Sequence, residues 1–356
     1  MTETSVSNVA ALAAERLVVD LASERLGAAV LYANDEFFAP AAGLLRPGPP
    51  EWREGAYTDR GKWMDGWETR RRREPGHDEC VIRLGATGRV REVVVDTSYF
   101  RGNQPESCSL DGASARGEDG EAPAPPADAS WTELLDRRTL APDAVHRFPV
   151  EESGRITHVR LRIFPDGGVA RLRVLGTVDP DWRRLASLGS VDLAALAHGG
   201  LPIAVSDATF GEPRNLLLPG DARNMGEGWE TRRRRGPGHD WVVIALGHRG
   251  VPERVVLSTR HFKGNYPAAA SLDAYDAGPG FRSPRPEGSA GSGPLTPPPV
   301  DAWRPLVPRV ELGPDAEHVL ADDLASGGPI THVRLAIYPD GGVARLRVIG
   351  RPVASP

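Results

Sequence analysis

Two nearly identical runs of polar residues hold most of the side chains in this chain that could carry chemistry. Residues 66–78 read GWETRRRREPGHD and return at 228–240 as GWETRRRRGPGHD, identical at 12 of 13 positions. Packing tolerates exchange among apolar residues, but it gives no reason for a run of Trp, Glu, four Arg, His and Asp to stay fixed. We therefore expect each run to contribute to a functional site.

The arginines of this motif suit the binding of an anion. If the motif is extended, Glu68, Arg70 and Arg72 share one face of the strand. A buried guanidinium is costly without a partner, so at least one Arg in each copy needs an acid or a ligand. Two interpretations remain open: a ladder of ion pairs with Glu68 and nearby acids, or a fork that grips a carboxylate through two hydrogen bonds. The candidate ligand-binding side chains of the two motifs are Arg70, Arg72, Arg232, Arg234, Trp67 and Trp229.

The end of the motif suits proton transfer. His77 stands beside Asp78, and the pair recurs as His239 and Asp240. An unperturbed imidazole changes charge near pH 6.5 (roughly), so a His next to a carboxylate can act as acid or base near neutrality. We take the histidines as the catalytic groups and the aspartates as their orienting partners. The alternative bases are Glu68 and Glu230, and the alternative structure is an Asx turn with a surface His.

A loop that also recurs provides a candidate rim for the site. Residues 100–103 read FRGN and return at 262–265 as FKGN, in each case after an expected strand. The side chains that would face a ligand are Arg101, Asn103, Lys263 and Asn265, although an ordinary turn explains the pattern equally well. No His-x-His or His-Glu-x-x-His spacing occurs, so we expect no metal and no cofactor.

The elements that position these residues are duplicated as well. Residues 156–176 and 330–350 match at 18 of 21 positions. The first copy is longer by ten residues between Leu45 and Gly66, which marks a surface loop. The Gly, Pro and Ser-rich stretch 278–299 reads as a second, flexible loop. We expect a first repeat at 1–177 with an amphipathic helix at 9–26, a helical linker at 178–200, and a second repeat at 201–356.

Short β-branched runs bounded by Gly and Pro indicate a mostly β fold. Strands are expected at 79–84 and 92–97 and at the equivalent positions of the second copy. Apolar and polar residues alternate over 157–163 and 169–174 around Asp166, Gly167 and Gly168, which predicts a β-hairpin, and the pattern recurs around Asp340. We expect two tandem antiparallel β-sandwich domains.

Composition limits the possible partners. A net charge of −5 argues against binding to nucleic acid or to acidic membranes, and no apolar run is long enough for a membrane span. The two cysteines, Cys80 and Cys108, are replaced in the second copy by Val242 and Ala270, which excludes thiol chemistry common to both repeats. Sparse cysteine indicates a reducing compartment, and we expect a cytoplasmic protein.

Three motifs together resemble allantoicase over nearly the whole chain. They are the duplicated Arg-rich run with its Pro-Gly-His-Asp end, the sequence YFRGN at 99–103, and DEFFAP at 35–40. The resemblance implies two galactose-binding-like jelly-roll domains and hydrolysis of allantoate to ureidoglycolate and urea in purine (allantoin) degradation. In the second copy DEFFAP becomes DATFGE at 207–212, which indicates that the two copies contribute unequally.

Allantoate is a small anion with one carboxylate and two ureido groups, which matches an Arg fork and side-chain amides. We also expect a homo-oligomer. The rival hypothesis is a non-catalytic module that binds a small anion or a sugar.

Overall fold

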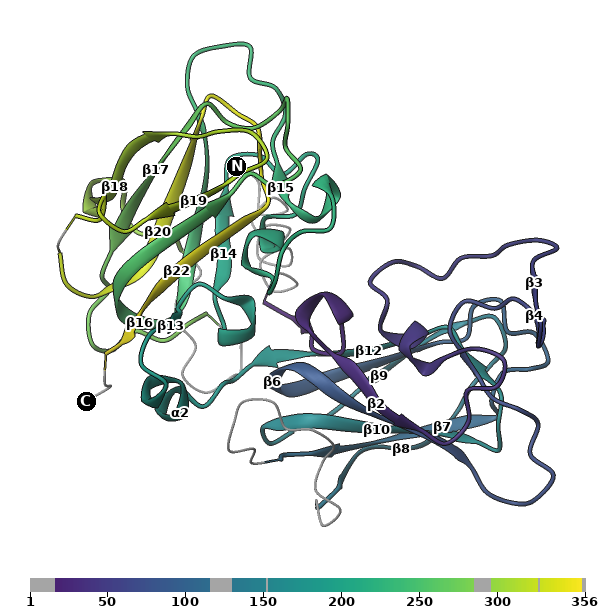
Figure 1. Cartoon of the computed structure of the whole chain (residues 1–356). Coiled ribbons are helices and arrows are strands. Elements are labelled where there is room, and N and C mark those ends of the chain that lie inside the picture. The colour runs from purple at the N-terminus through teal and green to yellow at the C-terminus, as the bar shows by residue number, and fades with distance from the viewer. Residues whose placement is uncertain (1–16, 116–129, 152, 285–295, 326, 354–356) are drawn as a thin grey trace, which may run out of the picture. The chain divides into compact units, whose positions relative to one another are not determined.

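The computed structural model describes residues 17–115, 130–151, 153–284, 296–325 and 327–353. It contains two compact units, of which one spans residues 19–179 and the other contains residues 180–356 (Figure 1). Both are built almost entirely of antiparallel strands. The expectation of a mostly β protein with two tandem sandwich domains is confirmed.

One long strand organises the first unit. β6 (Asp78–Asp96) pairs through its first half with β2 (Ala29–Ala33) and β10 (Ile156–Phe164). Its second half pairs with β9 (Val145–Pro149) and β12 (Arg171–Val178). β6 is therefore shared by two layers, β2-β6-β10-β7-β8 and β1-β12-β6-β9. The remaining elements are β1 (Val19–Asp20), η1 (Glu24–Leu26), η2 (Ala41–Leu45), β3 (Tyr57–Thr58), β4 (Gly61–Lys62), β5 (Trp67–Glu68), β7 (Ser107–Ala113), β8 (Thr132–Thr139) and β11 (Gly168–Val169).

The second unit repeats this topology around β16 (Asp240–Ser258), with the strand order β13-β22-β16-β20-β17-β18. Its other elements are α2 (Trp182–Ser187), β13 (Val191–Asp192), η3 (Leu196–His198), β14 (Leu201–Val205), η4 (Pro213–Leu217), η5 (Met225–Glu227), β15 (Trp229–Glu230), β17 (Ala269–Tyr275), η6 (Val300–Ala302), β18 (Arg304–Glu311), β19 (Glu317–Leu320), β20 (Ile330–Tyr338), β21 (Gly342–Val343) and β22 (Arg345–Pro352). Between η4 and β15 the chain forms only η5, so the β3–β4 hairpin of the first unit has no counterpart.

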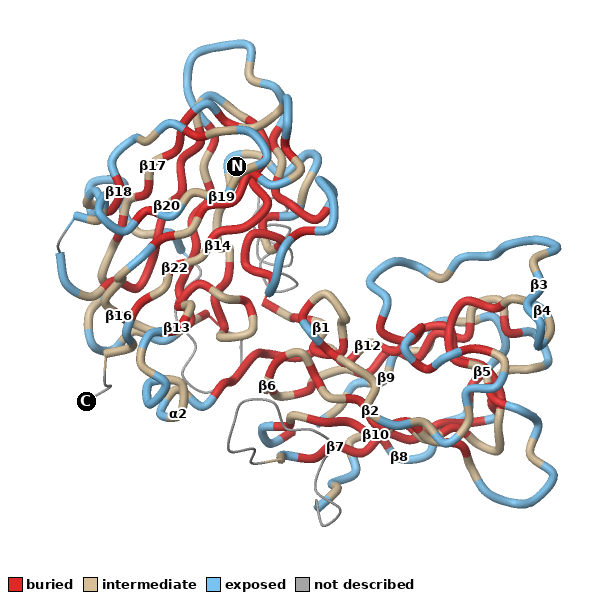
Figure 2. The backbone as a smooth tube through the Cα atoms, in the orientation of Figure 1, coloured by how far each residue is buried: buried red, intermediate tan, exposed pale blue. Residues whose placement is uncertain are grey.

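The core of each unit lies between its two layers, where the strands are buried and the connecting loops are exposed (Figure 2). Trp67 and Trp229 are among the largest fully buried side chains. The free cysteines Cys80 and Cys108 are also buried, and burial raises the pKa of both thiols, to about 12 for Cys108. Both thiols are therefore protonated at neutral pH, which leaves them unreactive.

The prediction of a β-hairpin around Asp166 and Asp340 is wrong in both copies. β10 and β12 follow one another through the turn at Asp166, but they do not pair, because β6 lies between them. The turn carries the chain from one layer to the other, and each strand then adds to a different half of β6. For the same reason the strands expected separately at 79–84 and 92–97 are one continuous strand.

The expected helices differ in outcome. Residues 17–26 of the helix expected at 9–26 contain β1 and η1, so that part of the expectation is wrong, and residues 9–16 lie outside the described part of the chain. The expected linker at 178–200 contains α2, and from Val191 onward it contains β13 and η3 of the second unit. Residues 285–295 of the expected loop at 278–299 lie outside the described residues. None of the helices in the described ranges is long and apolar enough to cross a membrane.

Candidate active site

The strand register collects the polar loops at one end of each unit. Gly88, in the middle of β6, pairs with both Ile156 at the start of β10 and Val178 at the end of β12. β6 therefore bends near Gly88. Its two ends, Asp78 and Asp96, lie at the same end of the sandwich. The motif at 66–78, the loop at 97–106 and the turn at 165–170 all emerge there.

A hydrogen bond between Glu68 and Asn103 joins two of these loops. The Asn103 amide donates to Glu68 Oε1 at 2.8 Å, and the Asn103 carbonyl accepts from the backbone N–H of Gly168 at 2.7 Å. Gly168 is required here, since a Cβ atom would lie 1.8 Å from the ring of Phe100. Burial raises the pKa of Glu68, and the hydrogen bond from Asn103 offsets only part of that effect.

A pocket of about 500 Å³ opens beside this pair, within the usual size range of small-molecule sites. The rings of Trp52 and Tyr99 lie 5.6 Å apart in the pocket wall, and Lys62 Nζ is 4.2 Å from the centre of the Trp52 ring. Asn103 lines the pocket and holds Glu68, so the pocket and the carboxyl group are one side chain apart. The complete lining is Trp52, Lys62, Met64, Tyr99, Arg101 and Asn103.

Asp143 fixes the turn that carries two of the pocket residues. Tyr99 has a positive φ of 71°, which is uncommon for a residue other than glycine, and its N–H donates to Asp143 Oδ1 at 2.7 Å. Arg101 donates to Asp143 Oδ2 through Nε at 2.9 Å and Nη2 at 2.6 Å. The hydrogen bonds from Tyr99 and Arg101 hold the pKa of Asp143 below its ordinary value. The charge of Arg101 is therefore already compensated within the protein.

The arginines of the motif bind acids other than the one expected. Arg70 Nε donates to Asp35 Oδ2 at 2.6 Å, so the expectation that Glu68 holds Arg70 is wrong. The reason is that β5 ends at Glu68, and the alternation of a strand does not continue to Arg70. Arg72 Nη1 pairs with Asp78 Oδ1 at 2.7 Å. The interpretation as ion pairs thus describes Arg70 and Arg72, the first with an acid of another loop and the second with the acid at the end of its own motif.

The second motif has the same pairs: Arg232 contacts Asp207 at 3.3 Å, and Arg234 bonds to Asp240. The hydrogen bond between Glu68 and Asn103 also has a counterpart, since the Asn265 amide donates to Glu230 Oε1 at 2.6 Å. Lys263, which replaces Arg101, lies 4.0 Å from Asp315.

The expected His–Asp pairs do not form. Asp78 is the first residue of β6 and is buried, where it also accepts from Asn34 Nδ2 at 2.9 Å. His77 Nε2 lies instead 3.6 Å from Glu79 Oε2, and its ring packs 5.3 Å from that of Phe164. Neighbouring residues in extended chain point to opposite sides, which separates His77 from Asp78. His239 packs in the same way, 4.8 Å from the ring of Tyr338.

Trp67 and Trp229 are structural. Neither is exposed, and each indole N–H donates at 2.8 Å to a backbone carbonyl, of Asp35 and Asp207 respectively. The expectation that they contact a ligand is wrong, because both rings are enclosed in the core.

A buried arginine, not singled out from the sequence, anchors the loop that carries Trp52 and Lys62. Arg171 Nη2 contacts Asp65 Oδ2 at 2.5 Å, and both side chains are almost completely buried. Arg171 also donates to the carbonyls of residues 43, 48, 49 and 170. Asp65 in turn accepts from the backbone N–H of Glu51 at 2.9 Å, next to Trp52.

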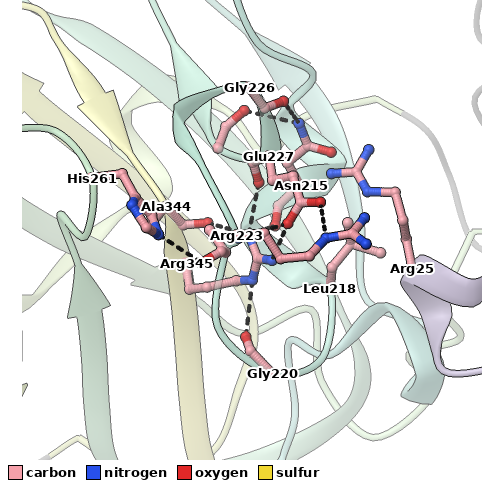
Figure 3. Close-up of polar contacts among 12 residues, drawn as sticks. Arg25, Asn215, Leu218, Gly220, Arg223, Gly226, Glu227, His261, Ala344 and Arg345 are labelled. Atoms are coloured by element: carbon pink, nitrogen blue, oxygen red, sulfur yellow. Dashed lines mark hydrogen bonds and ion pairs between the residues drawn. The ribbon is translucent and has the colours of Figure 1, made fainter. Parts of the chain in front are cut away.

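The equivalent arginine of the second unit has the same role. Arg345 donates to the carbonyls of Gly220 at 3.0 Å and of Glu227 and Ala344 at 2.7 Å each (Figure 3). Each unit therefore uses one buried guanidinium to tie the segment before its motif to the sheet. One signal could have revealed it: the Arg recurs at the equivalent position of both repeats, as Arg171 and Arg345.

A second cavity in the first unit, of about 660 Å³, lies at the opposite end of the sandwich. It is lined by part of β8 and by residues 149–151 and 153–156, and it contains none of the duplicated polar motif. Within the described ranges, no group of three or more His, Cys, Asp or Glu is arranged to hold a metal ion.

Comparison with known proteins shows the family to which this chain is related. A family model described as the allantoicase repeat matches residues 19–179 and 191–353. A probable allantoicase of Pseudomonas aeruginosa (strain LESB58) is 48% identical over 337 residues, which cover 95% of this chain and 97% of the relative. A probable allantoicase of Pseudomonas syringae pv. syringae (strain B728a) is 44% identical over 94% of this chain and 96% of the relative. The crystal structure of allantoicase from Saccharomyces cerevisiae is 31% identical, with a TM-score of 0.71 and 98% of both chains covered. The chain belongs to the allantoicase family.

Proposed function

We propose that this protein hydrolyses allantoate to ureidoglycolate and urea, a step in the degradation of purines through allantoin. The observation that carries the proposal is the match to probable allantoicases over 95% of this chain, both repeats included. The rival hypothesis of a non-catalytic binding module is not favoured, because the relatives that match this chain from end to end carry the name of an enzyme.

The reaction requires two proton movements at one carbon. The bond between the central carbon and one ureido nitrogen breaks, and that nitrogen gains a proton as urea departs. The oxygen of water bonds to the same carbon and loses a proton. One proton is therefore supplied and one is removed, so a single carboxyl group that begins protonated can act first as acid and then as base.

We assign this role to Glu68 in the first repeat. Burial raises its pKa above the ordinary value, which favours the protonated form more than in an exposed carboxyl group. Asn103 connects Glu68 to the pocket. The second N–H of the Asn103 side chain and its side-chain carbonyl oxygen suit the hydrogen-bonding pattern of a ureido group. His77 contacts Glu79 and Phe164 rather than any residue of the pocket lining, so the alternative base is preferred to the histidine.

The first repeat is the better candidate for the active copy. The second repeat retains the Glu230–Asn265 hydrogen bond, but it lacks the β3–β4 hairpin and the residues equivalent to Trp52 and Lys62. Its counterpart of Tyr99 is His261, whose ring Nε2–H donates to the backbone carbonyl oxygen of Ala222 at 2.7 Å. We propose that the second repeat preserves the scaffold of the site without the pocket wall.

The test is a urea-release assay on the full chain with two matched variants. Glu68→Gln keeps the shape of the side chain and its contact with Asn103, but it cannot exchange a proton, so kcat should fall by about 10²- to 10⁴-fold. Glu230→Gln makes the same change in the second repeat and should leave kcat close to that of the unaltered chain. Allantoin serves as a substrate control and should release no urea.

The outcomes separate the two parts of the proposal. Absence of urea from allantoate, with the unaltered chain folded, would reject the activity. Urea release that persists in Glu68→Gln at full kcat would reject the role of Glu68, and a loss confined to Glu230→Gln would move the site to the second repeat. Repeating the assay after dialysis against a chelator tests the expectation that no metal is needed.

Two further properties are part of the proposal. A cytoplasmic location is supported by the two cysteines, which are free and buried in the structure. Assembly into a homo-oligomer is proposed as well, and sedimentation equilibrium of the purified chain would test it.

A further inference from the structure

The pocket beside Glu68 contains two cationic side chains, and only one of them is compensated by an acid. Arg101 forms two hydrogen bonds with Asp143. Lys62 lines the same pocket, and within the described part of the chain no carboxylate forms an ion pair with it. Two arginines of the neighbouring motif are also engaged, Arg70 with Asp35 and Arg72 with Asp78, and none of the four arginines of the motif lines the pocket. Lys62 is therefore the cation of this site that is available to an anionic ligand.

The contacts of Lys62 hold the ammonium group at the pocket. Its Nζ lies 4.2 Å from the centre of the Trp52 ring, a distance at which the ring face attracts a cation. Trp52 itself packs against Tyr99 and follows Glu51, whose backbone is bound by the buried Asp65. A lysine placed in this way loses less conformational freedom on binding an anion than a fully solvated one does.

Taking the proposed function as given, we infer that Lys62 binds the carboxylate of the substrate and that Trp52 positions Lys62 for this contact. The two ureido groups then lie toward Asn103 and Glu68, where the proton transfers take place. In this arrangement Lys62 takes the role that the sequence suggested for Arg70. Both Trp52 and Lys62 lie between Leu45 and Gly66, the stretch that is ten residues longer in the first repeat and alone contains the β3–β4 hairpin, so we place the carboxylate subsite in the first repeat only.

The inference predicts a defect in binding rather than in chemistry. Lys62 is exposed, so Lys62→Met should leave folding intact and raise the KM for allantoate by about 10- to 100-fold, the range for a lost hydrogen bond to a charged group. The value of kcat should change little, and Lys62→Arg should restore most of the affinity. Arg53→Met is the matched control. Arg53 lies in the same loop, stacks 4.5 Å from Trp63 and pairs with Glu51, but it does not line the pocket.

A second measurement isolates the carboxylate. N-carbamoylglycine has one carboxylate and one ureido group, and N-carbamoylglycinamide is its neutral counterpart. The unaltered chain should bind the acid at least about 10-fold more tightly than the amide, as measured by calorimetry, and Lys62→Met should bind the two equally. A lysine with a merely structural role would weaken both ligands alike.

Failure of this inference differs from failure of the proposed function. If the unaltered chain releases urea and Lys62→Met keeps the same KM and the same preference for the acid, Lys62 does not bind the carboxylate. If the unaltered chain releases no urea, the proposed function fails, while the preference for the acid over the amide still decides whether Lys62 binds carboxylates. An equal KM defect in Arg53→Met would show a general effect of loop charge and would also overturn the assignment.

Discussion

Replacement of Arg171 by Met removes the buried guanidinium that anchors the insertion of the first repeat. Met fills most of the volume of the Arg stem, so the cost comes from the polar groups that lose their partner. Arg171 contacts one carboxylate oxygen of Asp65 and the carbonyls of residues 43, 48, 49 and 170. Asp65 keeps Arg46 at 2.7 Å and the Glu51 N–H at 2.9 Å, so it remains charged but loses its most buried partner.

The expected loss of stability is about 3 to 5 kcal/mol, the usual result of removing one member of a buried ion pair. A domain has only about 5 to 15 kcal/mol in total, so the first unit should unfold at a clearly lower denaturant concentration. Equilibrium unfolding in guanidinium chloride measures the change. The double variant Arg171→Met with Asp65→Leu should recover part of the loss, because it no longer leaves a carboxylate without its partner.

The effect should also depend on pH in a defined direction. Burial opposes the charge of Asp65, but hydrogen bonds from Arg171 and Glu51, with the charges of Arg171 and Arg46, hold its pKa below the ordinary value. Such a group stabilises the fold above its unfolded pKa of about 3.9, and this stabilisation is lost as the pH falls through the lower folded value. The penalty of Arg171→Met should be complete at pH 7 and should shrink below about pH 4. A penalty under about 1 kcal/mol at pH 7 would refute the reasoning.

Two further predictions concern the proton-transfer groups. Asn103→Leu removes a hydrogen bond that favours the charged form of Glu68. The limb of the pH profile of kcat/KM that reports Glu68 should therefore move to higher pH. A limb that does not move would count against the assignment of Glu68. His77→Ala and His239→Ala remove side chains that pack beside Phe164 and Tyr338 and do not line the pocket. Both variants should therefore retain kcat at saturating allantoate. A fall in kcat of about 10²-fold or more in either variant would assign that histidine a role in catalysis.

The fold class was readable from the sequence because it depends on local patterns. Alternating apolar residues, Gly-bounded short runs and the duplication itself all indicate strands and two domains. The pairing of those strands was not readable. The turn at Asp166 has every local property of a hairpin, yet β10 and β12 each gain a longer partner in β6, whose paired residues lie 68 to 90 positions earlier in the chain. Tertiary pairing overrode the local signal.

The site was only partly predictable for a related reason. Glu68 and Asn103 were singled out because they recur, and the structure brings them together. Lys62 and Trp52 were missed because a comparison of the two repeats gives no weight to an insertion found in one of them. A signal was present nonetheless, since the loop at 52–63 holds three large aromatic residues among several cations, an unusual composition for a surface loop. The partner of Arg70 could not be read, because Asp35 lies 35 positions away.

The shared central strand has a consequence for how each unit is made during synthesis. β6 takes its partners from residues 29–33 before it and from residues 145–149, 156–163 and 171–178 after it. Until the ribosome has released the chain beyond residue 178, half of the central strand has no neighbour on at least one side. Contacts of such long range form slowly, and exposed strand edges favour aggregation. The nascent first unit should therefore stay open to chaperones until its last strand emerges, and the second unit should repeat the delay up to Pro352.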